Sequence, residues 1–191
     1  MEGSSGARSF GVLDERSIST VNEIIKANRN LYHINRKPIA NVGEAIGRYP
    51  EDVYDGVGVS SGGAWPLLIA QTANFHYRLK KDLQTQRRIT VFPLTREFYE
   101  TVTGESVSEG TLTPSDRMYH KILGKLIERG DRFLLRVKLH AKPNGSLNEQ
   151  IHGNDGPLGG PGAMAGPEDL TWNYAEMMKA IQERQRATRD F

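Results

Sequence analysis

Apolar residues spaced three or four positions apart recur along this chain, and that spacing limits the folds it can adopt. In the first such stretch, from Arg16 to Tyr32, the residues Ile18, Val21 and Ile25 fall at this spacing with polar residues between them. The pattern predicts an amphipathic α-helix that turns one face toward a core. Four further helices are predicted on the same grounds, at 66–83, 94–102, 114–140 and from 167 onward.

Little in the sequence predicts β-structure. No stretch alternates apolar and polar residues for long enough, although residues 88–94, RITVFPL, are compatible with one short extended segment.

Two long loops are rich in glycine and proline. The first covers 35–54, with a short turn expected at 42–46, and the second covers 147–166 and is expected to hold no regular element. The predicted class is all-α.

Composition excludes several kinds of site and partner. The 191 residues are 37% hydrophobic, which is enough for one domain with a buried core. A net charge of +2 gives no reason to expect a nucleic-acid partner. The absence of cysteine excludes disulfides, thiolate catalysis and zinc–thiolate sites. The histidines lack the three- or four-residue spacing of helical metal ligands, so no metal site is predicted.

The N-terminal segment, MEGSSGARSF, lacks the apolar core of a signal peptide. No later apolar run approaches the roughly 20 residues needed to span a membrane. The chain as given is therefore predicted to be soluble, with no membrane partner. Residues 1–12 are expected to be disordered or to be an artefact of the gene model.

Four segments at predicted helix boundaries carry polar and aromatic side chains together. They are RYPEDVY at 48–54, GAW at 63–65, NGSLNEQ at 144–150 and EDLTWNY at 168–174. Long ordered loops at one end of a helical array usually hold functional residues. In this order and at this spacing, the four segments resemble the second half of the fungal-type glucoamylases of glycoside hydrolase family 15. The resemblance extends over about Ala40 to Arg186.

The resemblance implies an (α/α)6 barrel, of which this chain would form about half, the C-terminal half of the catalytic domain. It implies inverting hydrolysis of terminal α-1,4-linked glucose from the non-reducing ends of starch, glycogen or maltooligosaccharides, with release of β-glucose. An α-glucan substrate and the N-terminal half of the same barrel are the partners it implies, and no cofactor is expected. A truncated gene model or a fragment would explain the missing half.

Glu149 is the candidate catalytic residue. An inverting glycosidase needs one carboxylic acid to protonate the leaving oxygen and one carboxylate to activate water. By its motif, Glu149 resembles the family's general base, and without that motif it would be an ordinary solvated loop glutamate. A base must stay ionised, which hydration and nearby hydrogen-bond donors would favour. Nothing in the sequence resembles the family's general acid, so the isolated chain is expected to be inactive.

Polar residues of the RYPEDVY loop are candidates for contact with sugar hydroxyl groups. Arg48 and Asp52 carry over from the resemblance as substrate-contacting and site-organising residues, because paired donors and acceptors recognise hydroxyls. The alternative is a structural ion pair that ties the loop. Tyr49 and Tyr54 could pack against sugar faces or against the helix below.

Aromatic residues at two predicted helix starts are candidates for platforms under glucose rings. Trp65 and Trp172 are flat side chains suited to the C–H faces of sugars, although core packing would also explain them. Trp172 resembles the family's subsite aromatic residue. Gln150 could orient Glu149 or the attacking water.

Asn144 begins an N-glycosylation sequon, Asn-Gly-Ser, on the loop before Glu149. Together with the family resemblance, the sequon favours a secreted, secretory-pathway or vacuolar location for the full-length protein. Two other classes of function stay open. One is a catalytically inactive, glucoamylase-like carbohydrate-binding or regulatory domain. The other is a helical interaction scaffold, which the absence of a repeat period argues against.

Overall fold

Helices dominate the structure, as the spacing of apolar residues predicts. The computed structural model describes residues 10–36, 39–56, 58–59, 62–153 and 164–189. The elements follow one another as α1 (Glu15–Leu31), α2 (His33–Arg36), β1 (Gly63–Ala64), α3 (Pro66–Gln86), β2 (Ile89–Val91), α4 (Pro93–Thr103), β3 (Gly110–Leu112), α5 (Arg117–His140), β4 (Gln150–His152), β5 (Met164–Ala165) and α6 (Thr171–Thr188).

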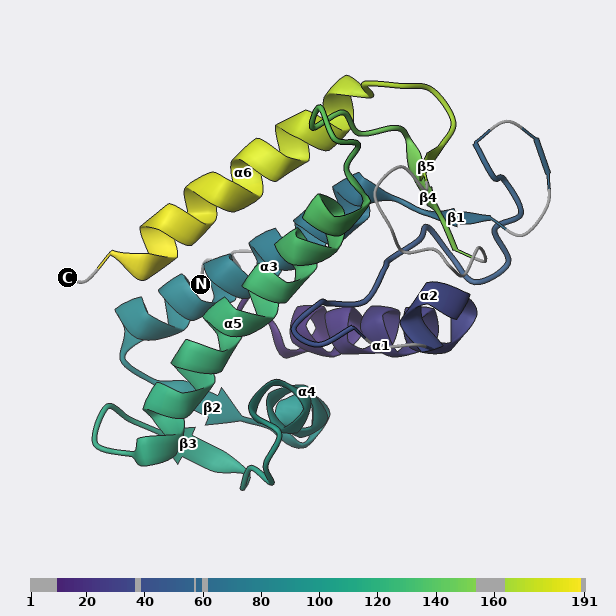
Figure 1. The fold of residues 1–191 in the computed structure, drawn as a ribbon. Helices are drawn as coiled ribbons and strands as arrows, with labels where there is room; N and C mark the ends of the chain where they lie inside the picture. Colours follow the sequence, from purple (N-terminus) through teal and green to yellow (C-terminus); the bar gives the residue numbers. More distant parts are fainter. Residues whose placement is uncertain (1–9, 37–38, 57, 60–61, 154–163, 190–191) are drawn as a thin grey trace, which may run out of the picture.

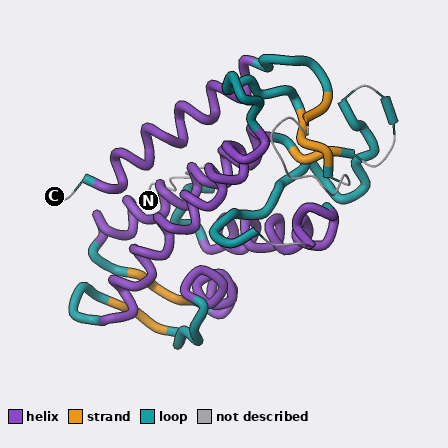
Figure 2. The backbone as a smooth tube through the Cα atoms, in the orientation of Figure 1, coloured by secondary structure: helices purple, strands orange, loops and turns teal. Residues whose placement is uncertain are grey.

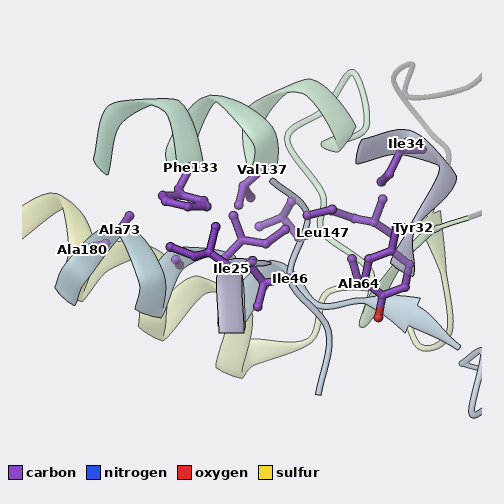
Figure 3. Close-up of a cluster of buried hydrophobic side chains, with 14 of the residues drawn as sticks. Ile25, Tyr32, Ile34, Ile46, Ala64, Ala73, Phe133, Val137, Leu147 and Ala180 are labelled. Atoms are coloured by element: carbon purple, nitrogen blue, oxygen red, sulfur yellow. The ribbon is translucent and has the colours of Figure 1, made fainter. Parts of the chain in front are cut away.

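The central element is α3, which packs against both α5 and α6 (Figure 1). It begins at Pro66, where the missing N–H of proline costs no helical hydrogen bond. It ends at Gln86, because the next residue, Arg87, has a left-handed backbone (φ 51°) that stops the helix. Figure 3 shows Phe133 and Val137 pointing from α5 toward the layer that holds Ile25 and Ile46. Burial of such side chains, at about 25 cal/mol per Å² of apolar surface, is what holds the helices together.

A second apolar cluster lies where α4 packs against α1 and α5. Beside it, β2 and β3 form an antiparallel pair in which Ile89 is opposite Leu112. The pair confirms the short extended segment expected at 88–94. Figure 2 shows that the strands occupy two small regions, near opposite ends of α5.

The other strands correct the expectation for the loop at 147–166. There β4 pairs with β1 on one side and with β5 on the other, all antiparallel, with Ile151 opposite both Ala64 and Met164. Residues 154–163 of that loop lie outside the described residues. The sheet escapes prediction because each strand is only two or three residues long and pairs with a segment distant in sequence, so no local alternation marks it. The turn expected at 42–46 is also absent, since that described segment has no regular structure.

The start of α6 differs from the prediction by several residues. Pro167, Glu168 and Asp169 precede the helix, which begins at Thr171 without an acidic residue in its first turn. Asp169 has a left-handed backbone (φ 53°) and accepts a hydrogen bond from the Ser146 hydroxyl at 2.7 Å. Asp169 also accepts a hydrogen bond from the Tyr174 hydroxyl in α6, and so ties the 144–150 segment to that helix instead of capping it.

Tyr32 joins the elements that surround the loop end of the molecule. Its side chain is 2% exposed, and its hydroxyl donates to the carbonyl oxygen of Gly63 in β1 at 3.1 Å. Two further glycines make room for it: a Cβ atom at Gly47 would lie 1.7 Å from the hydroxyl, and one at Gly153 would lie 2.2 Å from the ring. Burial raises the pKa of Tyr32 to about 12.

The N-terminal segment is partly described. Residues 1–9 lie outside the described residues, so the disorder expected for 1–12 stays a prediction. Residues 10–12 lead into α1, and the Arg16 guanidinium lies 4.4 Å from the centroid of the Phe10 ring. None of the described helices is both long enough and apolar enough to cross a membrane.

Candidate functional site

Glu149 lies immediately before β4, at the end of the molecule where α3 and α6 begin (Figure 1). Its backbone N–H donates to the carbonyl oxygen of Pro167 at 2.9 Å. Its side chain is half-buried, and the buried Oε2 atom makes no hydrogen bond within the described residues. A hydrogen bond to this carboxylate raises the pKa of the Tyr54 hydroxyl. Glu149 is thus held by the protein while one of its oxygen atoms is left for another donor.

Arg48 and Asp52 form a bidentate ion pair beside Glu149. Arg48 donates to the two carboxylate oxygens of Asp52 through Nε and one terminal nitrogen, each at 2.7 Å. The Asp52 side chain is 2% exposed and the Arg48 side chain is 37% exposed. The hydrogen bond from Arg48 lowers the pKa of Asp52, and Asp52 raises the pKa of Arg48. The structural ion pair considered from sequence is therefore present, and its arginine end faces the surface.

Three aromatic rings surround the Arg48 guanidinium. Its Cζ atom lies 5.1 Å from the Trp65 ring centroid, 5.4 Å from that of Tyr54 and 5.7 Å from that of Tyr49. These distances are within the range of cation–π attraction. Trp65 is buried and its indole N–H has no hydrogen-bond partner within the described residues, whereas Tyr49 is half exposed. Trp65 therefore combines a packing contact with a free donor.

The side chains of two predicted site residues, Trp172 and Gln150, make no hydrogen bond to this group within the described residues. Trp172, in the first turn of α6, is 56% exposed and donates to Glu176 at 3.2 Å. Gln150 is fully buried, and both polar atoms of its amide lack hydrogen-bond partners among the described residues. Gln150 is the first residue of β4, and Glu149 lies in the bend before the strand. The structure shows no hydrogen bond from Gln150 to Glu149.

Sequence reasoning missed the residues that pack around Glu149. Gly166 has a left-handed backbone (φ 75°), and a Cβ atom there would lie 3.0 Å from Glu149 Oε2. Gly56 lies against Gly166 in turn, since its own Cβ would be 2.7 Å from the Gly166 nitrogen. Asn148 and Asn173 are buried and bonded to each other. Asn173 belongs to a motif segment, but its amino-acid type alone does not distinguish a buried asparagine from an exposed one.

Asn144, the predicted glycosylation acceptor, is exposed after α5. Its side-chain oxygen accepts a hydrogen bond from the Ser146 N–H at 3.0 Å, so the sequon forms a tight local turn.

The arrangement supports chemistry on a polyol. It places a half-buried carboxylate near a guanidinium, a phenol hydroxyl and an indole N–H. Such a set can accept hydrogen bonds from sugar hydroxyls, donate to them and pack against the apolar face of a ring. Within the described residues, no group of three or more His, Asp or Glu side chains is arranged to hold a metal ion.

Comparison with known proteins gives one consistent answer. The profile of the family described as "Glycosyl hydrolases family 15" matches residues 4–182. Glucoamylase 1 of Rhizopus oryzae is 31% identical over 166 residues, covering 87% of this chain and 26% of that protein. The protein named "Glucoamylase, intracellular sporulation-specific" from Saccharomyces cerevisiae is 29% identical over 187 residues, covering 92% of this chain and 33% of its own length.

Solved structures agree with the sequence relatives. The family 15 glucoamylase of Hypocrea jecorina superposes with a TM-score of 0.80 at 27% identity, over 92% of this chain and 27% of that one. The Saccharomycopsis fibuligera glucoamylase gives 0.79 at 29% identity, over 97% and 38%. These neighbours are (α/α)6 barrels, so the predicted helical barrel class is confirmed. The chain spans about a third of the length of these relatives.

Proposed function

The chain belongs to glycosyl hydrolase family 15, and we propose that, within a complete barrel, it removes terminal α-1,4-linked glucose from the non-reducing ends of starch, glycogen or maltooligosaccharides. The relatives are glucoamylases by name. The proposed reaction inverts the anomeric centre and releases β-glucose.

Glu149 carries this proposal, because its carboxylate has the surroundings that a general base requires. A base activates a water molecule on the face of the sugar opposite the leaving group. The Tyr54 hydroxyl and the positively charged Arg48 both interact with this carboxylate. The half-buried Glu149 carboxylate is proposed to accept the proton of the attacking water molecule. Arg48 and Trp65 then supply a hydrogen-bond donor and an apolar surface for the sugar.

Two apolar grooves support the proposal that further helices complete the barrel. A groove of about 590 Å³ runs between α5 and α6, and its apolar lining includes Leu134, Leu135, Met177 and Ile181. A second, of about 430 Å³, lies between α1 and α3, and its apolar lining of Val21, Ile24, Leu68 and Phe75 borders Arg48 at the candidate site. Exposed apolar surfaces of this kind are usually covered by a partner. We assign both grooves to the helices that the relatives carry outside the matched third.

The general acid, the second carboxyl group that the reaction requires, is also assigned to the helices outside this chain. One carboxylate cannot protonate the leaving oxygen and activate the water at the same time. The general acid is therefore proposed to come from the part of the barrel that this chain does not contain.

A chimera tests this function directly. The complete enzyme, as the term is used below, is the Saccharomycopsis fibuligera glucoamylase in which this chain replaces the matching segment. The complete enzyme is expected to release glucose from maltooligosaccharides, with the β-anomer appearing first in a proton NMR time course. The isolated chain is expected to show no turnover. A folded chimera that binds maltooligosaccharides without hydrolysing them would favour the inactive binding domain instead.

Substitutions that introduce a negative charge inside and outside the α5–α6 groove provide a control for the chimera experiment. Leu135 is 41% exposed in the groove, and Leu94 is 48% exposed on α4, outside both grooves. Leu135→Glu should prevent assembly of the chimera, because a carboxylate buried without a partner costs several kcal/mol. Leu94→Glu should leave assembly and turnover unchanged. Equal behaviour of the two variants would argue against the groove as a contact with the rest of the barrel.

We further propose that the full-length protein passes through the secretory pathway and carries a glycan on Asn144. The exposed Asn144 side chain supports this proposal, although one relative is named as intracellular. In a yeast secretion host, endoglycosidase treatment is expected to lower the mass of the protein, and Asn144→Gln is expected to remove that change. Recovery of the peptide around Asn144 entirely unmodified would refute glycosylation at this site.

A further inference from the structure

Two buried asparagines link the starts of α3 and α6 to the backbone at Glu149. Asn173, in α6, is fully buried. Its side-chain oxygen accepts a hydrogen bond from the Leu67 N–H at 3.0 Å, and its side-chain nitrogen donates to the Asn148 carbonyl oxygen at 2.8 Å. The Asn148 side chain in turn donates to the Gly166 carbonyl oxygen at 3.0 Å. One asparagine thus connects two helix starts with the segment that precedes β4.

The peptide unit between Asn148 and Glu149 is fixed at both of its polar atoms. Its carbonyl oxygen accepts the hydrogen bond from Asn173, and its N–H, which belongs to Glu149, donates to the Pro167 carbonyl oxygen at 2.9 Å. A peptide unit is planar, so holding both ends sets the orientation of the plane. The direction in which the Glu149 side chain leaves the backbone follows from that plane and from its own torsion angles.

Gly166 limits the Glu149 side chain from the other side. Its backbone lies so close that a Cβ atom would be 3.1 Å from Glu149 Cβ and 3.0 Å from Oε2. A small rotation of the preceding peptide would therefore press the carboxylate into this backbone or move it away from Tyr54. Close packing of this kind leaves little freedom for a displaced side chain.

We propose that Asn173 is a positioning residue for Glu149: it holds the Asn148 carbonyl oxygen and thereby aims the Glu149 carboxylate at the Tyr54 hydroxyl. In catalytic terms the inference rests on the proposed function, since it gives the general base a fixed direction. Asparagine suits the position because one side chain supplies both a donor and an acceptor. Its loss leaves two buried backbone groups unpaired, one in α3 and one beside Glu149.

The test measures how strongly Glu149 and Tyr54 are coupled in the 191-residue chain. With carbon-13-labelled tyrosine, NMR gives the midpoint of the Tyr54 hydroxyl titration with and without Glu149→Gln. The carboxylate raises the pKa of Tyr54, so Glu149→Gln is expected to lower the midpoint. The size of that lowering measures the coupling between Glu149 and Tyr54. Because it is a difference between two midpoints in the same background, any direct effect of a further substitution on Tyr54 cancels.

The lowering of the Tyr54 midpoint by Glu149→Gln is then measured in chains that carry one further substitution. In Asn173→Ala the lowering is expected to shrink to about half or less, because the carboxylate is no longer aimed at Tyr54. Asn173→Asp keeps an oxygen for the Leu67 N–H but loses the donor to Asn148, and should show the same loss of coupling in a chain that stays folded. Asn22→Ala removes a buried asparagine that hydrogen-bonds Glu23 and Glu97 between α1 and α4, and should retain the full lowering.

Retention of the full lowering in a folded Asn173→Ala or Asn173→Asp chain would overturn the proposal. So would failure of both variants to fold, because Asn173 would then act on the fold as a whole. The titration involves neither substrate nor turnover, so its outcome is independent of the proposed activity. In the complete enzyme, the Asn173 variants should lower kcat by about 10-fold or more with KM changed by less than about threefold, as expected for a displaced catalytic group.

Discussion

Replacing Glu149 with glutamine in the complete enzyme is expected to lower kcat for maltooligosaccharides by about 100-fold or more. Glutamine has nearly the shape of glutamate but cannot accept a proton from water at working pH. Its amide can still accept the hydrogen bond from Tyr54, so the site should keep its geometry. The affinity for substrate is expected to change by less than about threefold, because the substitution removes an interaction made in the transition state.

Initial rates of glucose release over a range of maltotriose concentrations would separate kcat from KM. Glu168→Gln is the matched control, because Glu168 lies near Glu149 but is 69% exposed and pairs with Lys142. That pair is at the surface, where salt bridges contribute little, so Glu168→Gln should keep normal rates. A Glu149→Gln enzyme with near-normal kcat would remove Glu149 from the role of base.

The helices could be predicted from the sequence because each covers enough residues for a periodic pattern to appear. In α5, the residues Ile122, Leu126, Phe133 and Val137 are all buried, as their spacing indicates. Helix ends were less predictable. Thr113 and Pro114 favoured an earlier start for α5, but the helix begins at Arg117 after Asp116, whose carboxylate accepts from the Thr113 N–H at 2.7 Å.

The sheet near Glu149 could not be predicted, since its stability depends on contacts between distant segments. Ile151 pairs with Ala64, and neither residue stands in a stretch that alternates. The same reason explains why Tyr32 escaped notice. Its importance follows from three glycines in different segments: Gly47 and Gly153 leave room for its side chain, and the Gly63 carbonyl oxygen accepts a hydrogen bond from its hydroxyl.

The candidate site was partly predictable. Its charged and aromatic members were found through motif resemblance, and the structure brings Arg48, Asp52, Tyr54 and Trp65 into one group beside Glu149. Residues that act through backbone hydrogen bonds leave no such signal. Asn148 and Asn173 carry the same side chain as exposed loop asparagines, and only their burial and bonding partners set them apart.

The second large effect is expected on stability at acid pH, because two histidines are buried in uncharged form. His76 is fully buried among aromatic rings, and its Nδ1 atom bonds the Thr72 carbonyl oxygen at 2.7 Å while Nε2 has no partner within the described residues. His140 is also fully buried, with its Nε2 atom 3.5 Å from Arg136. Protonation of His76 would create a buried N–H without an acceptor among the described residues. Protonation of His140 would place a second positive charge beside Arg136.

These surroundings lower the pKa of both histidines from the ordinary value of 6.5 to about 4, mainly because burial disfavours the charged form. At pH values between about 4 and 6.5, the unfolded chain therefore binds protons that the folded chain does not bind. The resulting stabilisation is complete above pH 6.5 and is lost as the pH falls to about 4. A fall in pKa of this size corresponds to roughly 3 kcal/mol for each histidine.

Urea unfolding of the chain at pH 7, 5.5 and 4.5, followed by circular dichroism, would measure this loss. His76→Phe places an aromatic ring among Phe75, Phe98 and Phe133, and should lower stability at pH 7 but flatten its dependence on pH. His140→Gln should remove the part of the pH dependence that His140 causes, since glutamine does not titrate in this range. His120 is exposed and bonded to the Pro114 carbonyl oxygen, so His120→Gln should leave the dependence unchanged. If all three variants keep the pH dependence of the unaltered chain, the acid sensitivity belongs to the carboxylates and not to the buried histidines.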